Sequence, residues 1–240
     1  RITMMATNLL REYIRELLSE MAAPRQSDLA QVYYHGTPKE AYAKSIMANG
    51  IKVPDLSTRS GNLKPVEGKV YITPKISYAS IYAIGGSIAG SKASEWMLKD
   101  YGQYGYLFVI DGQQLKDIQP DEDSIGEMIF NGVDTQEDWL DDLARDELQY
   151  EDYDDDDQDL GYNSLYDAVM GGEYDAWAAA GKIVLGSMTD EEKLELIDLG
   201  AHIAHTGNLM PKETWRFDRK MTVELAKDGS NFFDLAERMQ

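Results

Sequence analysis

The side chains best suited to chemistry begin with the stretch VYYHGT (residues 32–37). It places His35, one of only three histidines in the chain, directly before Gly36. An imidazole can hydrogen-bond a hydroxyl group, and a residue without a Cβ lets a ligand approach the backbone N–H and C=O closely. Tyr71 follows His35 by 36 residues, and Tyr82 follows Tyr71 by eleven. This pattern predicts a site in which a histidine, bare backbone and aromatic rings face one ligand.

Two strand–helix units must position these residues. The first is a strand over 32–34, after which come His-Gly-Thr and an amphipathic helix over 38–51, whose Asn-Gly ending is a helix stop signal. The second is a strand over 68–73 followed by a helix over 77–86. Residues 104–111 (YGYLFVID) form the clearest predicted strand, which Asp-Gly terminates. The candidate residues therefore lie at strand ends and on the helix that follows the second strand.

The order of these motifs resembles the ADP-ribosyltransferase superfamily, in its diphtheria-toxin and poly-ADP-ribose-polymerase-like branch. That branch has His-Gly-Thr at the end of its first strand, a Gly-x-x-Tyr strand and a second tyrosine at similar intervals. The resemblance implies that the chain binds NAD, with Gly36 holding the nicotinamide carboxamide and Thr37 supporting it. It implies that His35 binds the ribose hydroxyls, that Tyr82 stacks on the nicotinamide ring and that Tyr71 walls the pocket.

The same branch carries a catalytic glutamate on a late strand, and the sequence offers two candidates for it. Glu213, in LMPKETWRF, opens a predicted strand and is the first choice; Glu127, in PDEDSIGEMI, lies in helical-looking sequence and is the alternative. With His35 and Tyr71 the glutamate would complete the catalytic set. A carboxylate there would stabilise the positive charge that develops on the ribose as nicotinamide leaves. The implied activity is transfer of ADP-ribose from NAD to a macromolecule, with protein as the favoured acceptor.

The sequence offers two candidate metal sites, and neither fits the spacing that its metal requires. His202 and His205 lie three residues apart on a helix predicted to run to residue 205, but a zinc-protease helix needs histidines four apart with a glutamate beside the first. The acidic run DYDDDDQD (residues 152–159) does not fit a calcium loop, because the loop register puts Leu160 at a ligand position. We expect structural roles for the histidines, a solvated acidic loop and no metal in the site.

Composition limits the partners. The chain has no cysteine, which excludes disulfides and thiolate chemistry and fits a cytoplasmic location. A net charge of −20 disfavours nucleic acid, whose phosphates must be neutralised by the protein. A related branch of RNA 2′-phosphotransferases surrounds its ligand with arginines, whereas here Arg59 lies in a predicted loop and Arg216 beside Trp215. No apolar run is long enough to span a membrane, so no membrane partner is expected.

The chain is expected to comprise an N-terminal amphipathic helix (residues 1–25) and an ADP-ribosyltransferase-like domain over residues 30–240. The predicted fold class is α+β: a split antiparallel sheet core, with an acidic helical insertion at about 120–205. The N-terminal helix and the insertion are the predicted places for partner docking. By analogy the protein would be a toxin or a phage-encoded effector acting in the host cytoplasm. The alternative is a catalytically inactive module of the same fold with a binding or virion-associated role.

Overall fold

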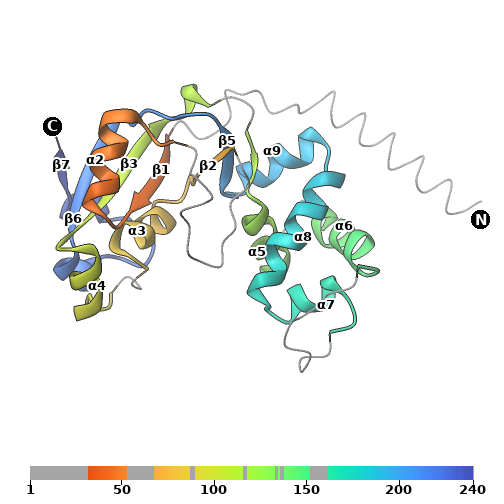
Figure 1. The fold of residues 1–240 in the computed structure, drawn as a ribbon. Helices are drawn as coiled ribbons and strands as arrows, with labels where there is room; N and C mark the ends of the chain where they lie inside the picture. Colours follow the sequence, from red (N-terminus) through yellow and green to blue (C-terminus); the bar gives the residue numbers. More distant parts are fainter. Residues whose placement is uncertain are drawn as a thin grey trace, which may run out of the picture.

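The computed structural model describes residues 32–52, 68–86, 90–115, 118–132, 135, 138–151 and 162–239. The predicted N-terminal helix, the acidic run at 152–159 and Arg59 lie outside these ranges. The described chain is α+β, with two antiparallel sheets flanked by helices (Figure 1). None of the described helices is long and apolar enough to cross a membrane.

The larger sheet has the strand order β1-β3-β6-β7. Its strands are β1 (Val32–Thr37), β3 (Tyr104–Asp111), β6 (Glu213–Asp218) and β7 (Glu237–Met239). The smaller sheet has the order β2-β5-β4, from β2 (Lys69–Ile72), β5 (Ile203–Thr206) and β4 (Gln119–Pro120). Among the described residues one bridge joins the two sheets: Tyr34 of β1 exchanges both backbone hydrogen bonds with Thr73, at 2.8 and 3.0 Å. The smaller sheet therefore continues the larger one through one pair of residues.

Two helices cover opposite faces of the larger sheet. Helix α2 (Glu40–Asn49) packs Ala43 and Ile46 against the face that carries Tyr33 and Phe108. Helix α3 (Ile76–Ile84) packs on the other face, which carries Leu107 and Phe217 and is also covered by α10 (Phe232–Leu235). Helix α4 (Glu95–Tyr101) leads back into β3. The predicted strand over 104–111 is confirmed, and the strand predicted over 32–34 is confirmed and continues through Thr37.

Glycines let α3 lie directly on the sheet. A Cβ on Gly36 would stand 2.0 Å from the carbonyl oxygen of Ala79 and 2.7 Å from the backbone nitrogen of Ala83. A Cβ on Gly105 of β3 would stand 1.9 Å from the carbonyl oxygen of Ala83. Backbone atoms cannot swing aside as a side chain can, so any side chain at these positions would push the helix off the strands.

We expect Gly36→Ala to lower the free energy of unfolding by about 3 kcal/mol, the upper end of the usual cost of overpacking. Urea unfolding followed by circular dichroism measures the change. Gly186→Ala is the matched control, because Gly186 is helical and exposed, and a Cβ added there would meet no atom within 4 Å. That control should be neutral or slightly stabilising. Equal effects of the two substitutions would contradict the packing of α3 on Gly36.

The other half of the molecule is helical, on the right in Figure 1. It contains α5 (Glu122–Asn131), α6 (Trp139–Leu148), α7 (Leu165–Met170), α8 (Tyr174–Ser187) and α9 (Asp190–Asp198). These helices share a core of their own, which includes Ile125, Leu140, Val184 and Leu196. The chain enters this half after β4 and leaves it into β5, so the small sheet connects the two halves.

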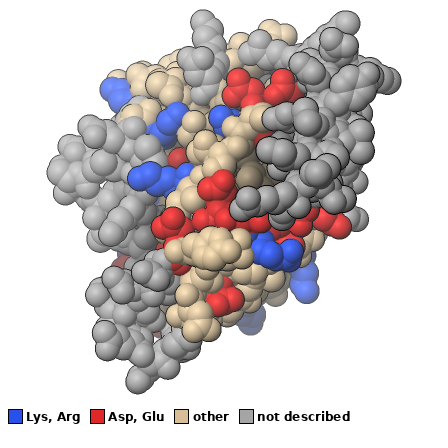
Figure 2. All heavy atoms as spheres, turned by 90° about the vertical axis from the view of Figure 1, so that its right-hand side faces the viewer, with Lys and Arg blue, Asp and Glu red and all other residues tan. Residues whose placement is uncertain are grey.

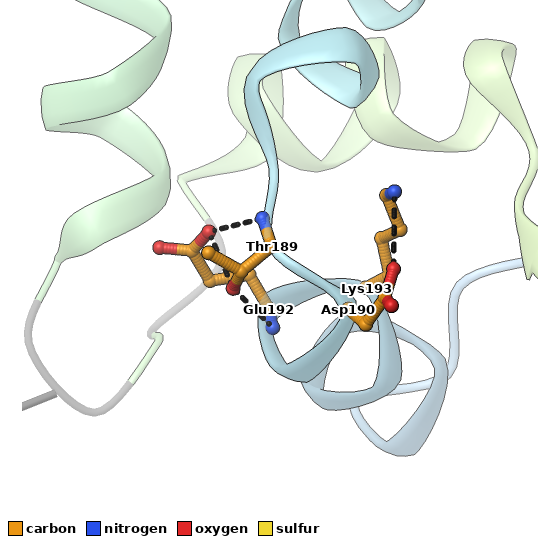
Figure 3. A network of polar contacts seen from close by, with 4 residues as sticks. All are labelled: Thr189, Asp190, Glu192 and Lys193. Atoms are coloured by element: carbon orange, nitrogen blue, oxygen red, sulfur yellow. Dashed lines mark hydrogen bonds and ion pairs between the residues drawn. The ribbon is translucent and has the colours of Figure 1, made fainter. Parts of the chain in front are cut away.

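Local sequence explains where α9 begins. Thr189 is its N-cap and accepts a hydrogen bond from the Glu192 N–H at 3.3 Å, while the Glu192 carboxylate accepts from the Thr189 N–H at 2.8 Å (Figure 3). This capping box satisfies two N–H groups that a helix start otherwise leaves unpaired. Lys193 reaches Asp190 one turn away, at 3.4 Å.

The surface of the helical half is acidic. Residues 138–151 and 162–198 contain 14 aspartates and glutamates but three lysines and arginines. Figure 2 shows red acidic side chains gathered across the middle of this side of the molecule. Such a surface repels anionic partners and attracts cationic ones.

The sequence predicts a helix through His202 and His205, and this prediction is wrong. Helix α9 ends at Asp198, and Gly200 takes the left-handed backbone conformation (φ +93°) that commonly terminates helices. The chain then becomes strand β5, which pairs with β2 on one side and β4 on the other. Partners far away in the sequence decide the conformation here, so the helical pattern of the preceding residues does not extend to the histidines.

Candidate functional site

The site begins where β1 and β2 part. The register of the Tyr34–Thr73 bridge would next place Gly36 opposite Tyr71. Among the described residues no backbone hydrogen bond joins those two; instead His35 Nδ1 donates to the Tyr71 carbonyl oxygen at 3.0 Å. A carbonyl oxygen only accepts, so Nδ1 carries the proton and Nε2 is the acceptor nitrogen of the neutral ring. The imidazole takes the place of a backbone ladder bond.

Gly36 turns its backbone polar groups to the same edge. In an antiparallel pair, successive residues direct their N–H and C=O alternately to one neighbour and then to the other. Tyr34 directs both groups to Thr73, so Gly36, two residues on, directs its own to the edge beyond Thr73. No hydrogen bond connects these Gly36 groups to a described residue of β2. Residue 36 must therefore be glycine so that α3 can pack against it. Its N–H and C=O are directed to the strand edge.

Of the other residues predicted for cofactor binding, Tyr71 lies at this edge, Tyr82 lies on the helix that packs on Gly36, and Thr37 does not project to the edge. Tyr71 is half-buried in β2. Tyr82 is 48% exposed on α3, next in sequence to Ala83, which touches Gly36. Thr37 is buried and projects to the opposite face of β1 from Gly36, since adjacent strand residues alternate. The same alternation directs the backbone N–H and C=O of Thr37 toward β3, so its predicted supporting contact with the ligand is not at this edge.

Glu213, the first choice for the catalytic glutamate, is not brought together with these residues. It lies in the row Tyr34–Val109–Glu213, two strands away from β1. Its carboxylate accepts from the Trp215 indole N–H at 3.0 Å and pairs with Arg238 of β7 at 2.9 Å. The two partners occupy both of its oxygens on the β6–β7 side of the sheet.

Glu127, the alternative, is connected to the site. It lies on α5, and its Oε1 accepts a hydrogen bond from the Tyr78 hydroxyl. Tyr78 and Tyr82 are one turn apart on α3, the helix that rests on Gly36. The structure thus places Glu127 of α5 in contact with the face of α3 that carries Tyr78 and Tyr82.

His202 adds a side chain that the sequence did not connect to this site. Its ring meets the Tyr78 ring edge-on, with 4.2 Å between centroids. Tyr71 pairs with Ala204, and His202 precedes Ala204 by two, so Tyr71 and His202 project to the same face of the small sheet. Residues 78, 127 and 202 are far apart in the chain, and no spacing rule relates them. Only knowledge of the β2-β5-β4 order could have indicated their contact.

Beside His202 lies a buried acid. The Asp121 N–H donates to the His202 carbonyl oxygen at 2.8 Å, and His202 Nδ1 lies 3.9 Å from Asp121 Oδ2. Burial, together with the charges of Asp123 and Glu122, raises the pKa of Asp121 to about 8. Burial and the nearby Lys75 cation lower the pKa of His202 to about 4. At pH 7 both side chains are therefore neutral, and their contact is not an ion pair.

Within the described ranges, no group of three or more histidine, aspartate and glutamate side chains is placed to hold a metal ion. Comparisons of the chain with protein-family models, with curated proteins and with solved structures found no match. The functional argument therefore depends on the site itself. The site offers the backbone N–H and C=O of Gly36 and the acceptor nitrogen of His35. It also offers two tyrosine rings and the Glu127 carboxylate, which is hydrogen-bonded to Tyr78.

Proposed function

We propose that the chain is an NAD-dependent ADP-ribosyltransferase with the split-sheet fold of that superfamily. The observation that carries the proposal is the β1–β2 edge, where the ladder stops after Tyr34 and His35 reaches the Tyr71 carbonyl. A primary carboxamide has one C=O and one NH₂, so it can exchange two hydrogen bonds with the N–H and C=O of Gly36. The resemblance of HGT, GKVYIT and Tyr82 to the superfamily motifs supports the same ligand.

The remaining side chains suit the rest of the nicotinamide riboside. Tyr82, half-exposed beside the Gly36 contact, would stack on the nicotinamide ring, and Tyr71 would close the side opposite Gly36. His35 would accept a hydrogen bond from a ribose hydroxyl at Nε2, because its Nδ1 proton is directed to Tyr71. Glu127 would be the carboxylate that faces the ribose, held by Tyr78.

In the proposed reaction, the bond between ribose C1′ and the nicotinamide nitrogen breaks, and its electron pair leaves with nicotinamide. C1′ becomes oxocarbenium-like, and the nearby carboxylate stabilises that positive charge. A nucleophilic atom of the acceptor then donates an electron pair to C1′ and releases its proton to solvent. The acceptor is a macromolecule, preferably a protein. The acidic surface of the helical half would favour acceptors with a basic surface and disfavour nucleic acid.

The test is incubation of the full chain with NAD labelled in its adenylate phosphate, in the presence of cell lysate. We expect nicotinamide release and label transfer by the wild type. Glu127→Gln should lower both by at least about 100-fold, because it removes the charge that faces the oxocarbenium ion. Glu213→Gln is the matched control and should stay within about twofold of the wild type, since Glu213 is held on the β6–β7 side.

Two outcomes would contradict this proposal. Absence of nicotinamide release by the wild type, with and without lysate, would exclude the transferase. Loss of activity in Glu213→Gln but not in Glu127→Gln would assign the carboxylate to the strand glutamate instead. Melting temperatures of each variant exclude unfolding as the cause, and Gly36→Ala is unsuitable for this assay because its Cβ would strike α3.

The second candidate is a binding module of the same fold without catalysis. It is favoured by the engagement of Glu213, because the glutamate on the late strand is taken up by Trp215 and Arg238. In that case calorimetry would detect NAD binding without nicotinamide release. His35→Ala would then weaken binding, whereas Glu127→Gln would leave it unchanged.

A further inference from the structure

Tyr78 links the two halves of the molecule at the proposed site. Its hydroxyl donates to Glu127 Oε1 on α5, and its ring rests against the edge of His202 just before β5. Tyr78 itself belongs to α3, which packs on β1 at Gly36. These three elements, β1, α5 and the segment before β5, are more than forty residues apart in the sequence. Tyr78 and its helix therefore connect the β1 edge to the Glu127 carboxylate by direct contacts.

The contact fixes the position of a flexible side chain. A glutamate on a helix has three rotatable bonds, and a charge placed about 1 Å off its productive position loses much of its effect on a reaction. The Tyr78 hydroxyl holds Oε1, and no described residue is hydrogen-bonded to Oε2. The carboxylate therefore has one anchored oxygen and a second that a ligand can use.

The His202 ring packs against the Tyr78 ring and restricts its movement. Its backbone is fixed on both sides, because its N–H donates to Ser124 Oγ at 3.0 Å and its C=O accepts from the Asp121 N–H at 2.8 Å. Its ring is 15% exposed and meets Tyr78 at 73°, a T-shaped contact that leaves the phenol little freedom to swing. The ring is neutral near pH 7, so it does not attract the Glu127 carboxylate away from Tyr78.

We propose that Tyr78 is a positioning residue, which anchors Oε1 of Glu127 so that Oε2 meets the ribose of the bound dinucleotide. This inference rests on the proposed transferase activity and adds a residue that the motif pattern does not include. It also explains why the two tyrosines on α3 are one turn apart: Tyr82 supplies a stacking ring and Tyr78 supplies the anchor for the carboxylate.

The experiment is a double-mutant cycle with Tyr78→Phe, Glu127→Gln and the double variant, assayed as kcat and KM for nicotinamide release from NAD. Tyr78→Phe keeps the ring against His202 and removes the hydroxyl alone. We expect its kcat to fall by about 10- to 100-fold with KM within about twofold, because a misplaced carboxylate affects the transition state and not substrate binding. The double variant should be no slower than Glu127→Gln alone.

Tyr42→Phe is the matched control, since Tyr42 is 56% exposed on α2 and its hydroxyl makes no hydrogen bond to a described residue. A Tyr78→Phe variant with wild-type kcat, or losses that multiply in the double variant, would overturn the positioning role and leave the transferase proposal intact. A wild type that releases no nicotinamide would overturn both. If Tyr78→Phe unfolds, Glu127→Asp replaces it, because the shorter carboxylate keeps its charge and cannot reach the hydroxyl.

Discussion

Replacing Arg219 by methionine should abolish folding at 25 °C or lower the free energy of unfolding by more than about 5 kcal/mol, a large part of what a domain has. Arg219 follows β6 and is completely buried. Its guanidinium donates only to backbone carbonyl oxygens among the described residues. The acceptors are Pro38, Ala83, Ile84, Tyr101, Gly102 and Tyr104.

These carbonyls come from three segments that meet at this end of the sheet: the end of β1, the end of α3 and the α4–β3 turn. Ala83 and Ile84 close helix α3, so Arg219 also lies at the negative end of the helix dipole. The Tyr101 ring lies 5.7 Å from the guanidinium carbon and adds a cation–π contact. Burial lowers the pKa of Arg219, but an arginine remains charged at neutral pH.

Methionine fills the same volume and leaves the carbonyls without donors, each at a cost of about 1–3 kcal/mol. Circular dichroism and urea unfolding measure the loss. Arg219→Lys should fold with reduced stability, because one ammonium cannot reach all of the acceptors. Arg216→Met is the control: Arg216 pairs with Glu237 on the exposed surface at 2.6 Å, and its loss should cost under about 1 kcal/mol. A stable Arg219→Met variant would contradict the role of this guanidinium.

The burial of Arg219 is a feature that the sequence does not predict. The apolar runs at residues 32–34 and 104–111 predict strands correctly, because those patterns depend on neighbours within the segment. Nothing local distinguishes Arg219 from an exposed arginine. Its burial follows from the meeting of β1, α3 and α4, which are distant in the sequence.

The candidate site likewise has one part that the sequence predicts and one part that it does not. The intervals from His35 to Tyr71 and Tyr82 lie within one strand–helix–strand–helix segment, and the structure places His35 and Tyr71 at the β1–β2 edge and Tyr82 on the helix that packs on Gly36. The sequence favours Glu213 over Glu127 through its distance along the chain and its strand-like pattern. The structure brings Glu127 to α3 through the hydrogen bond from Tyr78, and no local pattern encodes that contact.

Asp121→Asn should stabilise the protein by an amount that grows with pH, reaching about 3 kcal/mol at pH 8. The folded pKa of Asp121, about 8, lies above the ordinary aspartate value. Between about pH 4 and pH 8 the unfolded chain has lost this proton and the folded chain keeps it, so stability falls as pH rises and is then constant. The full shift would correspond to about 6 kcal/mol, and relaxation of the fold around the ionised acid reduces it.

His202 acts in the opposite direction. Its folded pKa, about 4, lies below the ordinary histidine value, so its contribution to stability is lost as pH falls from about 6.5 to 4. In the wild type the two slopes oppose each other below about pH 6.5, and above it Asp121 alone reduces stability. Asp121→Asn should therefore remove the decline between about pH 6.5 and 8 and expose a steeper loss below pH 6.5.

Urea unfolding at half-unit pH steps from 4 to 9 tests this prediction through the stability curve of the variant and its difference from the wild type, in which titrating groups that do not interact with Asp121 cancel. Asp123→Asn is the matched control for the loss of one negative charge from an acidic chain. Asp123 is less buried, and burial with Glu122 raises its pKa, so its curve should have the same sign and a smaller height. His202→Gln should remove only the branch below about pH 6.5. A flat Asp121→Asn difference curve would mean that Asp121 ionises normally in the fold, and the neutral Asp121–His202 contact beneath Tyr78 would then be wrong.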